Sequence, residues 1–191
     1  MSPFRDKILV ENLITHILSP VRDAIKPNIM ANTYTQIHIQ AVFTVQDRDS
    51  ILLSNFKDEL YKYITGIVQN NKHKLLAING MPDHIHILFG FRPSQSLSDL
   101  MQDIKGASSR WINEKRFVRS KFSWQEGYGA FSYSRTDVPT IIRYILQQQE
   151  HHKRRNFIEE YLDLLKESEI EYDDRFVFRP LGINYSVPDG T

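Results

Sequence analysis

The stretch His84-Ile85-His86-Ile87-Leu88-Phe89-Gly90-Phe91 alternates between two kinds of side chain, and this alternation decides the class of fold. Successive side chains of a β-strand point to opposite faces, so the odd-numbered residues, all apolar, share one face and the two histidines share the other. We predict a strand whose apolar face packs against helices and whose histidines face outward. Residues 37–45 show the same alternation of apolar and polar side chains and predict a second strand of this kind. His38 points away from its apolar face, so it is either a neighbour of the histidine pair or a surface residue.

Apolar residues elsewhere recur at the spacing of helices. Residues 54–70 and 97–111 each carry one apolar stripe, and Ser96 followed by Asp99 resembles an N-terminal cap for the second helix. A third helix is expected over residues 137–152, with the aspartate at its start as the N-cap.

The remaining patterns complete the order of elements. Residues 75–78 form a short apolar run that ends at Asn79-Gly80, a dipeptide that predicts a turn. Residues 122–134 predict a further strand or a pair of short strands, with bends at the glycines. The order β-α-β-β-α-β predicts an α+β fold: a ferredoxin-like split βαβ antiparallel sheet with two helices on one face. The helix over 137–152, which carries Tyr144, is an addition to that plan.

The chain divides by pattern into three parts. Residues 1–29 precede the first strand and are expected to be an extension outside the core domain, which spans residues 30–155. Residues 156–191 form an amphipathic helix and an acidic tail. No apolar run approaches the roughly 20 residues that span a bilayer, so we expect no membrane segment and a cytoplasmic protein.

Composition limits the chemistry. The 191 residues include no cysteine, which excludes disulfides, thiol catalysis and cysteine-bound metals and leaves histidine, carboxylate and amide ligands. The formal net charge of +1 hides an asymmetry: residues 105–155 hold eleven lysines and arginines against four acids, and residues 156–191 hold three against nine. The basic segment is interleaved with aromatic rings, which suits single-stranded nucleic acid, although a solvated helix face is equally compatible. Its candidate DNA-binding residues are Lys105, Arg110, Lys115, Arg116, Lys121, Lys153, Arg154 and Arg155.

Two pairs of residues are candidates for chemistry. His84 and His86 lie about 7 Å apart along one face of a strand and can share a divalent ion, although solvated histidines are the commoner case. Tyr144 and Gln148 are four residues apart and share one face of a helix, where they can offer a nucleophilic oxygen and a neutral oxygen ligand. Such a pair on a helix is more often an ordinary surface.

Taken together, the motifs carry a resemblance. They are Pro82-Asp83-His84-Ile85-His86, the aromatic and glycine-rich stretch 124–132, Tyr144 with Gln148, and His151-His152, preceded by the opening strand 34–40. In this order and at these distances they resemble the single-tyrosine HUH transposases of small bacterial insertion sequences, including the transposases associated with repeated palindromes. The similarity runs from about residue 30 to residue 155, and the resemblance implies that this segment is an HUH transposase domain.

The resemblance implies a function and a set of roles. It implies a metal-dependent endonuclease and strand transferase that acts on single-stranded DNA with hairpins through a 5′-phosphotyrosine intermediate. By likeness, His84, His86 and Gln148 hold magnesium or manganese, and Tyr144 is the nucleophile. Members of the family are homodimers that share their active sites between subunits.

Three alternatives stay open at this point. The chain could be a domesticated transposase that acts on repeated palindromes rather than moving itself. It could also be a non-catalytic ferredoxin-like module that binds single-stranded nucleic acid. The third alternative is an interaction protein whose strand histidines are solvated.

Overall fold

A computed structural model of the chain describes residues 34–46, 52, 54–153, 155–173 and 177. The predicted extension 1–29, Arg154 and most of the acidic tail therefore lie outside the described residues. The elements, in order, are β1 (Ile37–Thr44), α2 (Ser54–Asn70), β2 (Lys74–Met81), β3 (His84–Phe91), α3 (Leu97–Lys115), β4 (Gly129–Tyr133), α4 (Val138–Leu146), α5 (Gln148–His151) and α6 (Phe157–Glu167).

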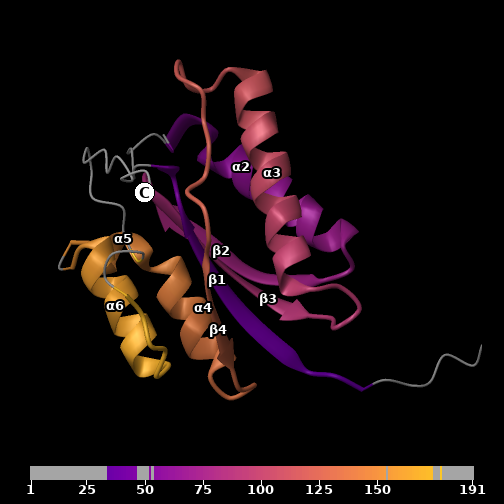
Figure 1. Ribbon diagram of the computed structural model, residues 1–191, viewed down its shortest axis with the longest axis vertical. Helices are drawn as coiled ribbons and strands as arrows, with labels where there is room; N and C mark the ends of the chain where they lie inside the picture. Colours follow the sequence, from indigo (N-terminus) through magenta and orange to yellow (C-terminus); the bar gives the residue numbers. More distant parts are fainter. Residues whose placement is uncertain (1–33, 47–51, 53, 154, 174–176, 178–191) are drawn as a thin grey trace, which may run out of the picture. The chain divides into compact units, whose positions relative to one another are not determined.

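The four strands form one antiparallel sheet in the order β2-β3-β1-β4. The strands β1 and β3, which are far apart in sequence, lie side by side at its centre (Figure 1). Their register pairs Thr44 with His84 and Val42 with His86. The predicted α+β class and the ferredoxin-like split βαβ order are confirmed.

The helices α2 and α3 cover one face of the sheet. This face is apolar because the odd-numbered residues of β3 point into it, and Ile85, Ile87 and Phe89 are fully buried there. The predicted cap of α3 is confirmed: the backbone N–H of Asp99 donates to the Ser96 hydroxyl oxygen over 3.1 Å.

The opposite face is covered by α4, α5 and α6 (Figure 1). Apolar residues of this layer include Val42 and Leu88 from the sheet and Ile145 from α4. The expectation that His84 and His86 face outward was therefore wrong in one respect. They point away from α2 and α3, but both are 0% exposed because the C-terminal helices lie over them.

The predicted turn at Asn79-Gly80 was wrong, because β2 continues through both residues to Met81 and the chain turns at Pro82-Asp83. Asn79 instead donates from its side chain to the carbonyls of Ile145 and Leu146, at 2.9 and 3.1 Å. A side chain at Gly80 would collide with the backbone of His84 on the neighbouring strand. Both residues are therefore explained by tertiary contacts rather than by a turn.

The expected single helix over 137–152 is two helices, with a break at Gln147. Asp137 makes no capping bond to the helix; its carboxylate accepts a hydrogen bond from the Ser134 hydroxyl. In the aromatic stretch 122–134 the structure has one strand, β4, and a single bridge between Val45 and Trp124. Within the described residues, no helix is long and apolar enough to cross a membrane.

Candidate active site

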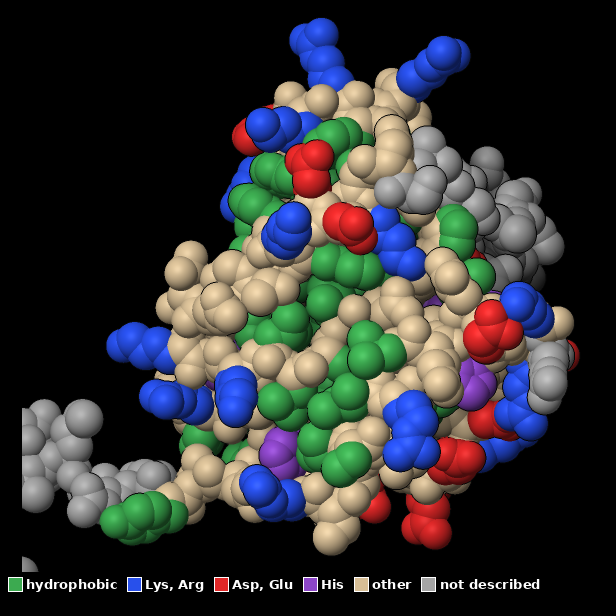
Figure 2. All heavy atoms as spheres, turned by 180° about the vertical axis from the view of Figure 1, so that it is seen from behind, with side chains coloured by type: hydrophobic (Ala, Val, Ile, Leu, Met, Phe, Trp, Pro, Cys, Tyr) green, Lys and Arg blue, Asp and Glu red, His purple; other side chains and the backbone are tan. Residues whose placement is uncertain are grey.

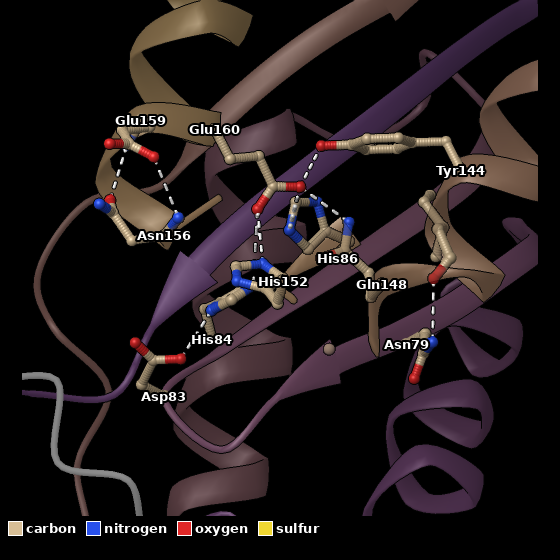
Figure 3. A network of polar contacts seen from close by, with 12 residues as sticks. Asn79, Asp83, His84, His86, Tyr144, Gln148, His152, Asn156, Glu159 and Glu160 are labelled. Atoms are coloured by element: carbon tan, nitrogen blue, oxygen red, sulfur yellow. Dashed lines mark hydrogen bonds and ion pairs between the residues drawn. The ribbon is translucent and has the colours of Figure 1, made fainter. Parts of the chain in front are cut away.

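The two histidines of β3, His84 and His86, lie on the sheet at the centre of the candidate site (Figure 3). Alternation along β3 points both to the same face, and their ring centroids lie 5.1 Å apart. Each ring is held from behind through Nδ1: the Asp83 carboxylate lies 2.8 Å from His84 Nδ1, and the Gln40 amide nitrogen lies 2.9 Å from His86 Nδ1. The Nε2 atoms of both rings are left facing the C-terminal helices.

Tyr144 on α4 and Gln148 on α5 point towards His86 from the C-terminal helices (Figure 3). The Tyr144 ring centroid lies 6.1 Å from that of His86, and Gln148 is fully buried. The structure thus brings together all four predicted residues of the site, and it does so within one chain. Asn79 holds the end of α4 and so fixes the point at which the chain passes from Tyr144 to Gln148.

Glu160 on α6 is a member of the site that the sequence did not reveal. Its carboxylate accepts hydrogen bonds from the Tyr144 hydroxyl, from the Gln148 amide at 2.8 Å and from His152 at 2.9 Å. Its oxygens also lie 3.6 Å from His86 Nε2 and 3.9 Å from His84 Nε2. A signal was present: Glu160 falls on the buried stripe of its helix, between Phe157 and Leu164, where an acid is out of place.

The helix α6 is fixed at its start, which sets the direction of Glu160. Asn156 and Glu159 form a capping box, and the ring of Phe157 stacks on His84 at a centroid distance of 4.2 Å. The first turn of α6 is therefore anchored both to its own backbone and to the metal-binding candidate beneath it.

Burial and neighbouring charges shift the pKa values of three groups in the site, His84, Tyr144 and Glu160. Burial lowers the pKa of His84, although Asp83 opposes this, so the ring is held neutral and able to act as a ligand. Burial and the charge of Glu160 raise the pKa of Tyr144 well above its ordinary value. Burial would also raise the pKa of Glu160, but the hydrogen bond from His152, the nearby His86 ring and the hydrogen bond from Tyr144 outweigh it and hold that pKa well below its usual range.

Buried polar atoms without partners test whether a metal ion fits here. Among the described residues, His84 Nε2, His86 Nε2 and Gln148 Oε1 are buried and make no hydrogen bond. In addition, ligand atoms of His84, His152 and Glu160 lie within 4.8 Å of one another, which makes these three a possible metal site. Imidazole nitrogens with carboxylate and amide oxygens are a donor set suited to a divalent cation.

The chain matches one known protein family over most of its described residues. The family described as "Transposase IS200 like" matches residues 33–148. This range includes all four strands of the sheet as well as Tyr144 and Gln148. The chain belongs to the IS200-like transposase family. This IS200-like transposase is therefore a DNA-binding enzyme of transposition, as the motifs of the sequence implied.

Individual relatives agree with the family. The chain is 25% identical over 120 residues to the ISDra2 transposase TnpA of Deinococcus radiodurans, a match that covers 60% of this chain and 86% of that protein. Two solved structures share the fold. One is a crystal structure of a candidate transposase from Deinococcus radiodurans R1, with 23% identity, a TM-score of 0.51, and coverage of 61% of this chain and 94% of that one. The other is a REP-associated tyrosine transposase bound to a REP hairpin, with 16% identity, a TM-score of 0.50, and coverage of 63% and 72%.

A cavity of about 270 Å³ borders the site of this IS200-like transposase, and Tyr144, His152 and Glu160 are among the residues that line it. Arg155, a predicted DNA-binding residue, lies at the same cavity, where it pairs with Asp163 over 2.6 Å.

The other predicted DNA-binding residues of the transposase differ in their surroundings. Lysine and arginine side chains project at the end of the molecule where α3 terminates (Figure 2). The exposed ones in this region include Arg110, Lys115, Arg116 and Lys121. Lys105 is half-buried and donates to the carbonyls of Gln125 and Gly127, at 2.6 and 2.5 Å. Lys153 is exposed and pairs with Glu150.

Proposed function

We propose that this transposase cuts and rejoins single-stranded DNA that carries hairpins, with Tyr144 as the nucleophile. The observation that carries the proposal is that the Tyr144 hydroxyl and two buried histidines lie around one carboxylate, that of Glu160, within one chain. Apart from Glu160, these groups come from motifs that resemble those of single-tyrosine HUH transposases. The pocket offers a nucleophile and a set of ligands within reach of one phosphate.

The covalent step is a transfer between oxygens. Tyr144 Oη attacks the scissile phosphorus and forms an O–P bond, while the bond from phosphorus to the 3′ oxygen breaks and that oxygen takes up a proton. The phenolic proton passes to the Glu160 carboxylate, which already accepts the hydrogen bond of the hydroxyl. Attack by another 3′ hydroxyl on the 5′-phosphotyrosine reverses the step, so rejoining needs no ATP.

The metal in this proposal is magnesium or manganese, held by His84, His86 and Gln148 with Glu160 at the same point. The three predicted ligands each offer a buried atom without a partner among the described residues. A bound divalent ion would polarise the scissile phosphate and orient it for in-line attack. The protein residues keep the His84 imidazole neutral, aim both rings at one point and exclude bulk water.

The partners in this proposal are a hairpin-bearing single strand and a second copy of the chain. The exposed basic residues near the end of α3 contact the phosphate backbone. The family resemblance implies a homodimer with shared active sites, in which α4 to α6 of one subunit would serve the histidines of the other. A domesticated transposase that acts on repeated palindromes would have the same active site and use the same chemistry.

The test is a covalent adduct assay with Tyr144→Phe. The wild-type chain, given a hairpin-bearing single strand and Mn²⁺, is expected to form a protein–DNA adduct that survives denaturation. Tyr144→Phe is expected to form none, while Tyr63→Phe, a change on α2 at the other face of the sheet, leaves the adduct unchanged. An adduct with Tyr144→Phe contradicts the nucleophile, and binding without any adduct favours the non-catalytic alternative.

A further inference from the structure

The aromatic and glycine-rich segment before β4 borders a second cavity, separate from the one at Tyr144. The sheet pairs Gly129 with Val42, and the next bridge beyond it joins Trp124 to Val45. Two residues on one side of this gap therefore face four on the other, 125–128, and these four bulge out of the sheet. A cavity of about 310 Å³ lies here, between the bulge, the end of β1 and α6.

Hydrogen bonds hold the bulge in place. The Gln125 backbone N–H donates to the Thr44 carbonyl, and the Thr44 hydroxyl donates to Gln125 Oε1, both over 2.9 Å. The Lys105 ammonium donates to the carbonyls of Gln125 and Gly127. Gly127 has a φ of 77°, which favours glycine at this position. This wall of the cavity is therefore preformed, which lowers the cost of binding a ligand.

Aromatic rings line the cavity from two segments of the chain. Tyr128 comes from the bulge, and Phe157 and Tyr161 come from α6, where their ring centroids lie 5.6 Å apart. Glu126 also lines the cavity and is exposed, so the cavity opens to solvent. A flat, largely apolar ligand can enter from that side and stack on a ring.

The polar groups of the lining narrow the class of ligand. Glu126 and Asp173 bring negative charge to the cavity, which disfavours an anion such as a phosphate. Their oxygens accept hydrogen bonds, and the amide of Gln125 can donate as well as accept. A nucleobase suits this lining, because it combines a flat ring for stacking with N–H donors and acceptors on its edge.

Phe157 connects this cavity to the candidate active site. Its ring stacks on His84 at a centroid distance of 4.2 Å and also lines the cavity. We propose that the cavity binds one unpaired base of the single strand, that of a nucleotide next to the scissile phosphate. The base stacks against Tyr128 and the rings of α6, and Gln125 binds its polar edge. This inference rests on the proposed function, because only there does the scissile phosphate lie beside His84.

The experiment measures the affinity of the full chain for a labelled hairpin-bearing single strand by fluorescence anisotropy. In a series of strands, one abasic nucleotide replaces each nucleotide of the single-stranded flank in turn. We expect one position at which the missing base weakens binding by about 5- to 150-fold, the effect of one stacked base. This position is expected next to the phosphate that is joined to the protein in the adduct assay.

Tyr128→Leu removes a ring from the cavity and is expected to weaken binding of the intact strand. The loss caused by the abasic nucleotide is then expected to shrink by about twofold or more, because the base and the ring act on each other. Tyr63→Leu, which removes a half-buried tyrosine of α2, is the control and is expected to preserve the full abasic effect. If Tyr128→Leu does not fold, Gln125→Leu is measured in its place, with the same expectation.

The outcomes separate this inference from the proposed function. A wild-type chain that is insensitive to every abasic position overturns the base pocket, even where the adduct forms. An unchanged abasic effect in the folded cavity variants overturns it as well, and a sensitive position far from the adduct phosphate overturns its place beside the active site. An abasic effect that the cavity variants reduce, in a chain that forms no adduct, supports the base pocket and contradicts the proposed cutting of DNA.

Discussion

At the scale of single residues, the carboxylate of Glu160 joins Tyr144, the proposed nucleophile, to the candidate metal ligands. It contacts the Tyr144 hydroxyl and the Gln148 amide, and it lies within 4 Å of three histidine nitrogens. A buried charge is tolerated only when it is paired and hydrogen-bonded, and these groups supply the pairing. The same carboxylate that would accept the proton of Tyr144 also holds the hydroxyl protonated while no cation competes for it.

This gives a prediction for Glu160→Gln. The pKa of Tyr144 is raised by burial and then by the negative charge of Glu160, so removal of that charge is expected to lower the pKa towards its ordinary value of about 10. The measurement is a pH titration of the Tyr144 ring by ¹³C NMR in the ion-free chain. Glu159→Gln is the control, because glutamine preserves the capping box and Glu159 faces Asn156 rather than the site. A Tyr144 pKa that is unchanged in Glu160→Gln contradicts this account.

The sequence revealed the residues whose local pattern also indicates a partner. His84, His86, Tyr144 and Gln148 could be predicted because strand and helix periods place each pair on one face. Glu160 carries a local signal, an acid on the buried stripe of α6, but its partners are distant in sequence. Gln40 carries no such signal, because its contact with His86 depends on the pairing of two strands.

At the scale of elements, the edge strand β2 determines where α4 ends. The Asn79 side chain donates to two carbonyls in the last turn of α4, a region where helix carbonyls lack their usual donors four residues on. Tyr144 lies just before this point and Gln148 just after it, so the break at Gln147 aims both side chains at the histidines. The sequence could not predict the break, because neither glycine nor proline marks it and the asparagine responsible lies on another element.

Asn79→Ala is expected to damage the site as well as the fold. Loss of the two hydrogen bonds is expected to lower the free energy of unfolding by about 1–3 kcal/mol, measured by urea denaturation. Because Tyr144 loses its fixed position, the rate of adduct formation is expected to fall by about tenfold or more.

Asn71→Ala is the matched control for Asn79. Its side chain donates to the Ile67 carbonyl at the end of α2, on the other face of the sheet. We expect a loss of stability of the same sign without a loss of the adduct rate in the folded protein. Equal adduct rates in the two variants contradict the role of Asn79 in positioning α4.

At the scale of the whole molecule, the near-zero net charge conceals an unequal distribution. Exposed basic side chains gather where α3 ends and in the segment that follows, while acidic residues dominate from α6 onward. Binding to phosphates releases counterions, so such a surface makes affinity for single-stranded DNA depend on salt.

The combined variant Lys115→Gln, Arg116→Gln and Lys121→Gln tests this surface. If each side chain contacts a phosphate, the slope of log affinity against log salt is expected to lose about 0.7 for each contact removed. The measurement is fluorescence anisotropy of a labelled hairpin strand over a range of salt concentrations. Lys62→Gln, an exposed change on α2, is expected to leave the slope unaltered. A wild-type slope in the combined variant contradicts a DNA contact at this end.

The position of Glu160 near the end of the described chain has a consequence for protein synthesis. Chains emerge from the ribosome with the N-terminus first, so β1, β2 and β3 are made before Tyr144 and Glu160. A nascent chain that has released only these strands carries both histidines without Tyr144 or Glu160. Under the proposed function, a chain therefore cannot assemble its own site before α6 has been synthesised.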